Sequence, residues 1–115
     1  MTNKYKYFVA NWKMFGNLNT VNSINKVVKL SKLRKFKKTK IIYCPPYTLL
    51  NSFVEKLRNT KIEVGGQNCH YESRSGPFTG SISSQMIKNI GCNYVIIGHS
   101  ENRKEGETNK IINKK

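Results

Sequence analysis

The order of apolar segments along the chain constrains its fold more than any other feature. Lys40–Cys44 (KIIYC) and Tyr94–Gly98 (YVIIG) each contain an unbroken apolar run, which is typical of strands buried on both faces of a parallel sheet. Two more strands are predicted at Tyr7–Trp12 and Ile62–Gly65. Segments with apolar residues at helical spacing separate the strands, so the sequence predicts an α/β fold with right-handed crossovers.

The segments between the strands have recognisable helix signals. Helices are predicted at Asn19–Lys32, Tyr47–Leu57, Ser81–Ile90 and Glu107–Lys115. The first should be capped by Asn19 or Thr20 and the third by Ser81 or Ser83, because these side chains accept hydrogen bonds from free backbone N–H groups. Both a doubly wound sheet and a (β/α) barrel fit this order, but the turn after the first strand lacks the GxGxxG of a dinucleotide fold.

Length and composition restrict the class of protein. A chain of 115 residues, 37% hydrophobic and 23% charged, is expected to be a single globular domain. Its apolar runs are far shorter than the roughly 20 residues that cross a bilayer, and no apolar segment follows the N-terminal lysines. We therefore expect a cytoplasmic protein without a signal peptide. Cys44, Cys69 and Cys92 form no CxxC pair, so reduced thiols and no metal site are expected.

The net charge of +15 has two interpretations. One is a nucleic-acid-binding surface, whose affinity would come from neutralising phosphates. The other is a lysine-rich surface without a specific partner. The abundance of asparagine supports this interpretation, because lysine and asparagine together indicate a bias towards AT-rich codons. The densest basic segment, residues 32–40, carries no nucleic-acid-binding motif. We favour the second interpretation and expect no nucleic-acid partner.

Two of the predicted strands lead to polar side chains at the same edge of the sheet. Side chains alternate along a strand, so Lys13 continues the side of Val9 and Asn11, and His99 continues the side of Val95. Parallel α/β folds bind their ligands at this carboxyl edge. A lysine and a histidine there suit an anionic ligand with a carbonyl group, although a surface lysine and a structural histidine would give the same pattern.

Four short motifs resemble the N-terminal part of the triosephosphate isomerase family, in the family's order and at its spacings. They are Asn11–Met14 (NWKM), Gly66–Cys69 (GQNC), Gly76–Gly80 (GPFTG) and Gly98–Glu101 (GHSE). The resemblance implies that residues 1–115 are a single partial domain. This domain would be the N-terminal half of a TIM (β/α)8 barrel, with about four parallel strands of a fold that typically has about 250 residues.

The resemblance also implies a reaction and assigns residues to it. The family interconverts dihydroxyacetone phosphate and glyceraldehyde 3-phosphate by proton transfer through an enediolate, without cofactor or metal. Lys13 would face the phosphate and the developing oxyanion, Asn11 would place Lys13 and contact the substrate, and His99 would polarise the carbonyl oxygen. This family is known for a histidine kept uncharged by a helix N-terminus, and Ser100–Arg103 could form the corresponding turn.

Other residues in the motifs would support this site. Ser100 and Glu101 lie next to His99, and Glu101 would orient groups or carry protons. Phe78 and Thr79 would lie in a loop that reaches into the partner subunit of a homodimer when the protein is full length. Glu107 resembles the acid that opens the family's fourth helix and is expected to be structural.

The sequence departs from the family in two ways. The family usually has two arginines after the His-Ser-Glu motif, whereas Asn102 takes the first position here, which puts a tie to the loop before the third helix in doubt. The family's catalytic base, a glutamate after the sixth strand, has no counterpart in 115 residues, so these residues alone are expected to have no isomerase activity. The alternatives are a small basic nucleic-acid-binding module and an inert half-barrel.

Overall fold

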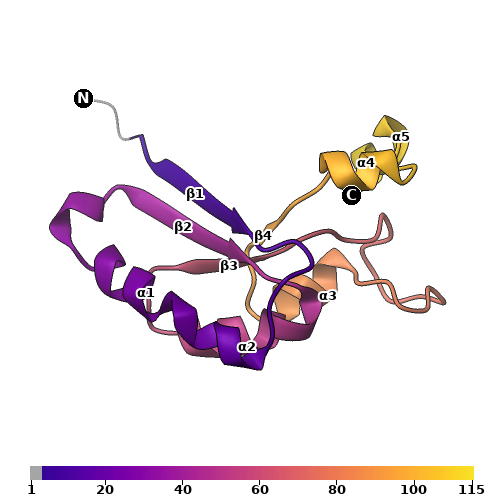
Figure 1. Cartoon of the computed structure of the whole chain (residues 1–115). Helices are drawn as coiled ribbons and strands as arrows, with labels where there is room; N and C mark the ends of the chain where they lie inside the picture. Colours follow the sequence, from indigo (N-terminus) through magenta and orange to yellow (C-terminus); the bar gives the residue numbers. More distant parts are fainter. Residues whose placement is uncertain (1–3) are drawn as a thin grey trace.

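Four parallel strands form one sheet in the computed structural model, which describes residues 4–115 (Figure 1). The strands lie in sequence order and are β1 (Lys6–Asn11), β2 (Thr39–Cys44), β3 (Glu63–Gly66) and β4 (Tyr94–Val95). Asn11 lies opposite Cys44 in the register, and Gly66 lies opposite Val95. The predicted parallel α/β sheet is therefore confirmed, and the carboxyl ends of its strands lie at one edge.

Helices make up most of the connections between strands. They are η1 (Leu18–Ile24), α1 (Asn25–Ser31), η2 (Arg34–Phe36), α2 (Tyr47–Leu57), α3 (Ser84–Asn89), α4 (Ser100–Lys104) and α5 (Asn109–Lys114). Figure 1 shows α1, α2 and α3 on one side of the sheet, whereas α4 and α5 lie together beyond the end of β4. Among residues 4–115, no helix has the length and apolar character needed to span a membrane.

The core lies between the helices and one face of the sheet. Phe53 of α2 is fully buried, and the Trp12 ring meets it edge-on with 5.0 Å between the ring centroids. Burying a side chain of this size stabilises the fold by about 1.5–3 kcal/mol. Because Trp12 packs into this core, the chain that follows β1 is held firmly at the carboxyl edge of the sheet.

The start of the first helix differs from the prediction. The segment divides into η1 and α1, and the cap is Asn17 rather than Asn19 or Thr20. The Asn17 side chain accepts the N–H groups of Asn19 (3.0 Å) and Thr20 (3.3 Å), and the Thr20 hydroxyl accepts the Asn17 N–H (3.0 Å). The 3-10 turn places this cap further upstream than the apolar periodicity indicates.

Three other predicted elements are longer than the observed ones. The fourth strand stops at Val95 instead of Gly98, although the Ile96 N–H still donates to the Gly66 carbonyl at 2.9 Å. Helix α3 begins at Ser84 because Ser83, one of the two predicted caps, accepts the N–H of Met86 at 3.1 Å. Helix α5 begins at Asn109 after a Thr108 cap, two residues later than predicted.

The second face of the sheet is covered unevenly. Val9 of β1 is 52% exposed, whereas Ile42 and Cys44 of β2, which lie opposite Val9 and Asn11 in the register, are only 3% and 1% exposed. Helices α1 to α3 cover only the opposite face, and four strands do not enclose an interior of their own. The burial on both faces predicted for Lys40–Cys44 is therefore found in β2, whereas in the other predicted run, Tyr94–Gly98, Ile97 is 42% exposed.

Candidate active site

The turn after β1 presents Lys13 in an uncommon backbone conformation. Lys13 has a φ of 54°, in the left-handed region that costs a residue with a side chain roughly 1–2 kcal/mol. The Asn11 side chain accepts the Lys13 N–H at 2.9 Å, and the Trp12 N–H donates to the Cys44 carbonyl at 3.0 Å. Asn11 therefore holds the backbone of Lys13.

Gln67, directly after β3, fixes the same turn from its other side. Its side-chain amide donates to the carbonyl of Lys13 at 2.7 Å and to the carbonyl of Cys44 at 2.9 Å. It thus joins the ends of β1 and β2 across the carboxyl edge. Gln67 was not predicted to have a role, although it too is a polar residue at the end of a parallel strand, like Lys13 and His99.

His99 caps the short helix α4. Its Nδ1 accepts the N–H of Glu101 at 3.2 Å, and the ring is partly buried, with 27% of its side chain exposed. A ring nitrogen that accepts an N–H carries no proton, so the uncharged ring has its proton on Nε2. Ser100 is the first residue of α4 and is exposed. The predicted helical turn at Ser100–Arg103 is confirmed.

Glu101 contacts both Lys13 and His99. One carboxylate oxygen pairs with the Lys13 ammonium at 2.8 Å, and the other lies 3.5 Å from Nδ1 of His99. The hydrogen bond from Lys13 is the main reason that the pKa of Glu101 lies below its usual value. Lys13 and Glu101 are both about half exposed, and with Gln67 they line an open depression of about 700 Å³ that His99 does not line.

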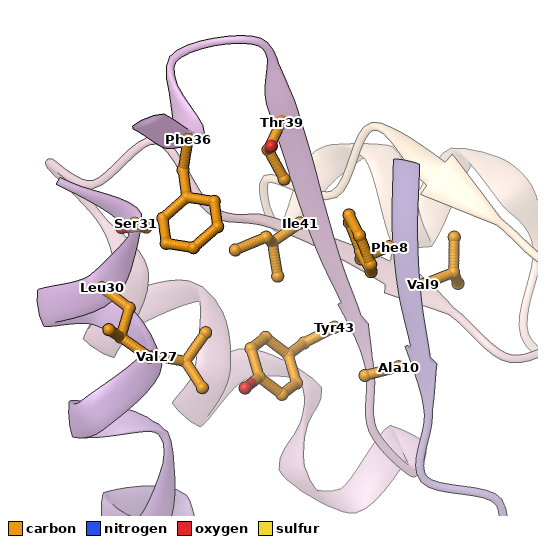
Figure 2. Close-up of a pocket in the computed structure, with 10 residues that line it drawn as sticks. All are labelled: Phe8, Val9, Ala10, Val27, Leu30, Ser31, Phe36, Thr39, Ile41 and Tyr43. Atoms are coloured by element: carbon orange, nitrogen blue, oxygen red, sulfur yellow. The ribbon is translucent and has the colours of Figure 1, made fainter. Parts of the chain in front are cut away.

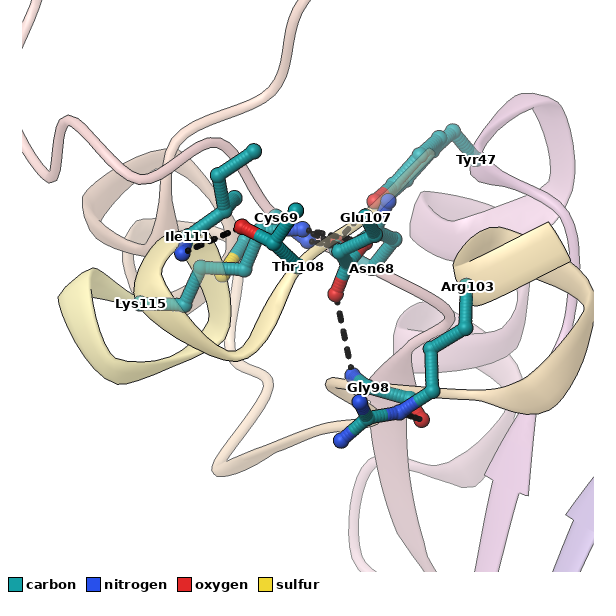
Figure 3. A network of polar contacts seen from close by, with 9 residues as sticks. All are labelled: Tyr47, Asn68, Cys69, Gly98, Arg103, Glu107, Thr108, Ile111 and Lys115. Atoms are coloured by element: carbon teal, nitrogen blue, oxygen red, sulfur yellow. Dashed lines mark hydrogen bonds and ion pairs between the residues drawn. The ribbon is translucent and has the colours of Figure 1, made fainter. Parts of the chain in front are cut away.

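A second ion pair contacts Gly98 and is almost fully buried (Figure 3). The Lys115 ammonium lies 3.0 Å from the Glu107 carboxylate, and the two side chains are only 5% and 8% exposed. Glu107 also accepts the backbone N–H of Gly98 at 3.2 Å, and Lys115 donates to the Asn68 side chain at 2.7 Å. The expected structural role of Glu107 thus has a physical basis, because it holds the residue before His99.

Lys115 was not predicted, since no periodicity or motif distinguishes it from its lysine neighbours. It meets Asn68 across 47 positions of sequence, a contact that only the fold creates. Asn68 is also bound to α2, because the Tyr47 hydroxyl donates to its carbonyl. Burial raises the pKa of Tyr47 to about 12, so this hydroxyl remains a donor across the neutral range.

Asn102 does not supply the tie to the loop before the third helix that its presence put in doubt. Within residues 4–115 its side chain makes no hydrogen bond, and its backbone carbonyl accepts the N–H groups of Glu105 and Glu107. Arg103 instead stabilises the turn, donating to the Gly98 carbonyl at 3.0 Å and to the Asn109 side chain at 2.7 Å.

The loop with Phe78 and Thr79 lies apart from these residues. The Phe78 ring packs on His70, with 4.3 Å between the ring centroids, and remains 37% exposed. Thr79 is exposed. The loop thus exposes the side chains of Phe78 and Thr79 to solvent, and the contact with His70 partly fixes the Phe78 ring.

Comparison with known proteins shows which family the chain belongs to. The family model for triosephosphate isomerase matches residues 6–115. The chain belongs to the triosephosphate isomerase family. The triosephosphate isomerase of Dictyoglomus thermophilum is 43% identical over 111 residues, which are 96% of this chain and 44% of that protein. The enzyme of Herpetosiphon aurantiacus is 50% identical over 76 residues, 65% of this chain and 30% of that protein.

The fold agrees as closely as the sequence. The crystal structure of triosephosphate isomerase from Bartonella henselae superposes with a TM-score of 0.86 at 35% identity, covering 96% of this chain and 45% of that one. The chain therefore spans less than half the length of the triosephosphate isomerases it matches. Its curled sheet of four parallel strands with helices corresponds to the N-terminal half of a TIM barrel.

Proposed function

We propose that this chain forms the N-terminal half of a triosephosphate isomerase active site, which interconverts dihydroxyacetone phosphate and glyceraldehyde 3-phosphate without a cofactor. The observation that supports it most is the contact of Lys13 and His99 with the same residue, Glu101. Its carboxylate pairs with the Lys13 ammonium at 2.8 Å, and its backbone N–H donates to Nδ1 of His99 at 3.2 Å. These residues come from opposite ends of the chain. Side chains with unrelated structural roles would have no reason to gather at one point of the carboxyl edge.

In this proposal each group acts on a different part of the substrate. The Lys13 ammonium attracts the phosphate and stabilises negative charge on the oxygen of the enediolate. His99 offers the N–H of Nε2 to the carbonyl oxygen, since its Nδ1 is occupied by the Glu101 N–H. Asn11 and Gln67 keep the Lys13 turn in its strained conformation, so that little reorganisation is needed when substrate arrives.

In the protein without substrate, the Glu101 carboxylate would be the anion that pairs with the Lys13 ammonium. Its ion pair with Lys13 is exposed on both sides, and exposed pairs of this kind contribute little to stability. An incoming phosphate or oxyanion can therefore take over the Lys13 ammonium without destabilising the fold. Ser100 supports this exchange by beginning the helix that carries Glu101.

The proton-abstracting base is proposed to come from the half of the family fold that this chain does not match. Proton abstraction requires a base within hydrogen-bond reach of the substrate carbon, and Glu101 is already paired with Lys13. We therefore expect no turnover by residues 1–115 alone. In the complete protein, a cytoplasmic homodimer is proposed, with Phe78 and Thr79 in the contact between subunits because their loop exposes an aromatic side chain.

The test is titration of the ¹⁵N-labelled chain with dihydroxyacetone phosphate, alongside a coupled isomerase assay. Shifts are expected at Lys13, Gln67 and His99, with no turnover. Lys13→Met should weaken binding at least tenfold, because the ammonium that faces the phosphate is removed. The matched control is Lys110→Met, an exposed lysine of α5, which should bind as the parent does. Turnover by the chain alone, or shifts that avoid Lys13 and His99, would contradict the proposal.

A further inference from the structure

Cations gather at the amino edge of the sheet, opposite the edge that carries the candidate site. Figure 1 shows the starts of β1, β2 and β3 on one side of the molecule, away from α4 and α5. Exposed basic side chains lie there, contributed by the first residue of β1, the segment between α1 and β2, and the residues before β3. They are Lys6, Arg34, Lys35, Lys37, Lys38 and Lys61, and together they are called the basic edge.

Short contacts hold these three segments together. The Lys6 N–H donates to the Lys38 carbonyl at 2.9 Å, and the Lys61 ammonium donates to the Phe36 carbonyl at 2.8 Å. The Phe36 ring points into the apolar groove between α1 and β2 (Figure 2). Because this ring anchors η2 to the body of the molecule, the cations on either side of Phe36 are left at the surface.

The basic edge has no acid to neutralise it. Among residues 4–115, none of its six cations forms an ion pair. Glu63, which follows Lys61 by two positions, is partly buried and accepts the side-chain amide of Asn93 at 3.1 Å. At the opposite edge, by contrast, Lys13 and Lys115 each pair with a glutamate. The basic edge therefore presents its positive charges to solvent without compensation.

Two features favour a lipid surface over a nucleic acid as the anionic partner. Stacking of bases requires free aromatic rings. Here the Lys40 ammonium lies 5.4 Å from the centroid of the Tyr5 ring, and the Lys35 ammonium lies 5.2 Å from that of Phe36. Leu33, directly before Arg34, is 45% exposed. The interface of a bilayer can bury such a side chain, whereas a phosphate backbone offers it no apolar contact.

We propose that the basic edge is a docking surface for a bilayer that contains anionic lipids. The negative potential of such a bilayer attracts every lysine and arginine near it and requires no complementary shape. This agrees with a lysine-rich surface that carries no recognition motif. Leu33 adds an apolar contact, and a basic patch with one such contact gives reversible, peripheral binding. The inference does not depend on the proposed isomerase activity, because the candidate site lies at the opposite edge.

The probe is a pair of phospholipid vesicles that are sedimented with the chain. Vesicles of phosphatidylcholine with phosphatidylserine should bind the chain, and vesicles of phosphatidylcholine alone should not. Raising the salt from about 0.05 to 0.5 M should release the chain, because salt screens exposed charges. No binding to the phosphatidylserine vesicles at the lower salt concentration, or equal binding to both kinds of vesicle, would overturn the proposal.

Matched double variants locate the charge that matters. Lys37→Gln with Lys38→Gln should weaken binding to the phosphatidylserine vesicles about tenfold, because two cations near the lipid surface are lost. Lys104→Gln with Lys110→Gln removes the same charge from exposed lysines of α4 and α5 and should leave binding nearly unchanged. Equal losses in the two double variants would show that net charge alone decides binding, and the basic edge would not be the docking surface.

A leucine variant separates a bilayer from other polyanions. Leu33→Ser should weaken vesicle binding several-fold, whereas Leu18→Ser, at a 69% exposed leucine of η1, should have no effect. Equal binding by Leu33→Ser and the parent chain would contradict the proposal. Tighter binding of a single-stranded oligonucleotide than of the vesicles, at equal phosphate concentration, would assign the basic edge to nucleic acid instead.

Discussion

Two ion pairs contact the Gly98–Glu101 segment, and they differ in almost every physical respect. The Lys13–Glu101 pair is about half exposed on both sides, whereas the Lys115–Glu107 pair is at least 92% buried and has additional hydrogen bonds to Asn68 and Gly98. The exposed pair can exchange its anion for a ligand at little cost. If either partner of the buried pair is removed, the remaining charge is left buried without a partner or solvent. The exposed Lys13–Glu101 pair is therefore suited to binding a ligand, whereas the buried Lys115–Glu107 pair fixes the backbone.

The largest effect is expected from breaking the buried pair. Lys115→Met should destabilise the chain by about 3–5 kcal/mol, because the Glu107 carboxylate is left buried without a cation. The free energy of unfolding in urea measures this, with the exposed Lys110→Met as control. A loss no larger than that of Lys110→Met would show that the buried pair does not stabilise the fold as described.

The double variant Lys115→Met with Glu107→Leu sharpens the same comparison. It removes both charges, so it should recover part of the stability lost in the single variant. It also removes the acceptor of the Gly98 N–H, so the recovery should be incomplete by about 1–3 kcal/mol. Complete recovery would mean that Glu107 does not hold the segment before His99.

An intermediate effect is expected from Gln67→Ala. This change removes two hydrogen bonds and leaves the Lys13 and Cys44 carbonyls without the amide, for a loss of about 1–2 kcal/mol in urea unfolding. Hydrogen exchange at the Lys13 turn should become faster than in the parent chain. Unchanged exchange there would show that Gln67 does not position Lys13.

The smallest effect on stability is expected from the exposed pair, where pH is the better measurement. Because the pKa of Glu101 is lowered in the folded chain, its pairing with Lys13 is fully present above the ordinary glutamate pKa and is lost as pH falls through the lowered value. A ¹³C titration of the Glu101 carboxyl should show this, and Lys13→Met should return the pKa towards its usual value. An unchanged pKa in Lys13→Met would contradict the pairing.

The parts predicted well from the sequence are those determined by local patterns. Helix α2 has the predicted bounds because Leu49, Leu50, Phe53 and Leu57 form one buried stripe over a regular helix. The lower accuracy at η1 has a local cause too, because a 3-10 turn has a different period from the α-helix that was assumed.

The parts that the sequence did not predict depend on distant contacts. Lys115 is one of many lysines, and only the fold brings it to Glu107 and Asn68. The exposure of Val9 was missed for the opposite reason, because its apolar run implies a covering layer that is not among the described residues. Lys13 and His99 were located because each follows a parallel strand, although the register places Val9 and Val95, whose sides they were expected to continue, on opposite faces of the sheet. Glu101, which contacts both residues, was given only a loose role.

The most direct measurement of the central claim is a crystal structure of this chain at neutral pH. The account predicts that the Glu101 carboxylate contacts the Lys13 ammonium within hydrogen-bond distance and that Nδ1 of His99 accepts the Glu101 N–H. Lys13 and His99 on opposite faces of the sheet, with Glu101 in contact with neither, would contradict it.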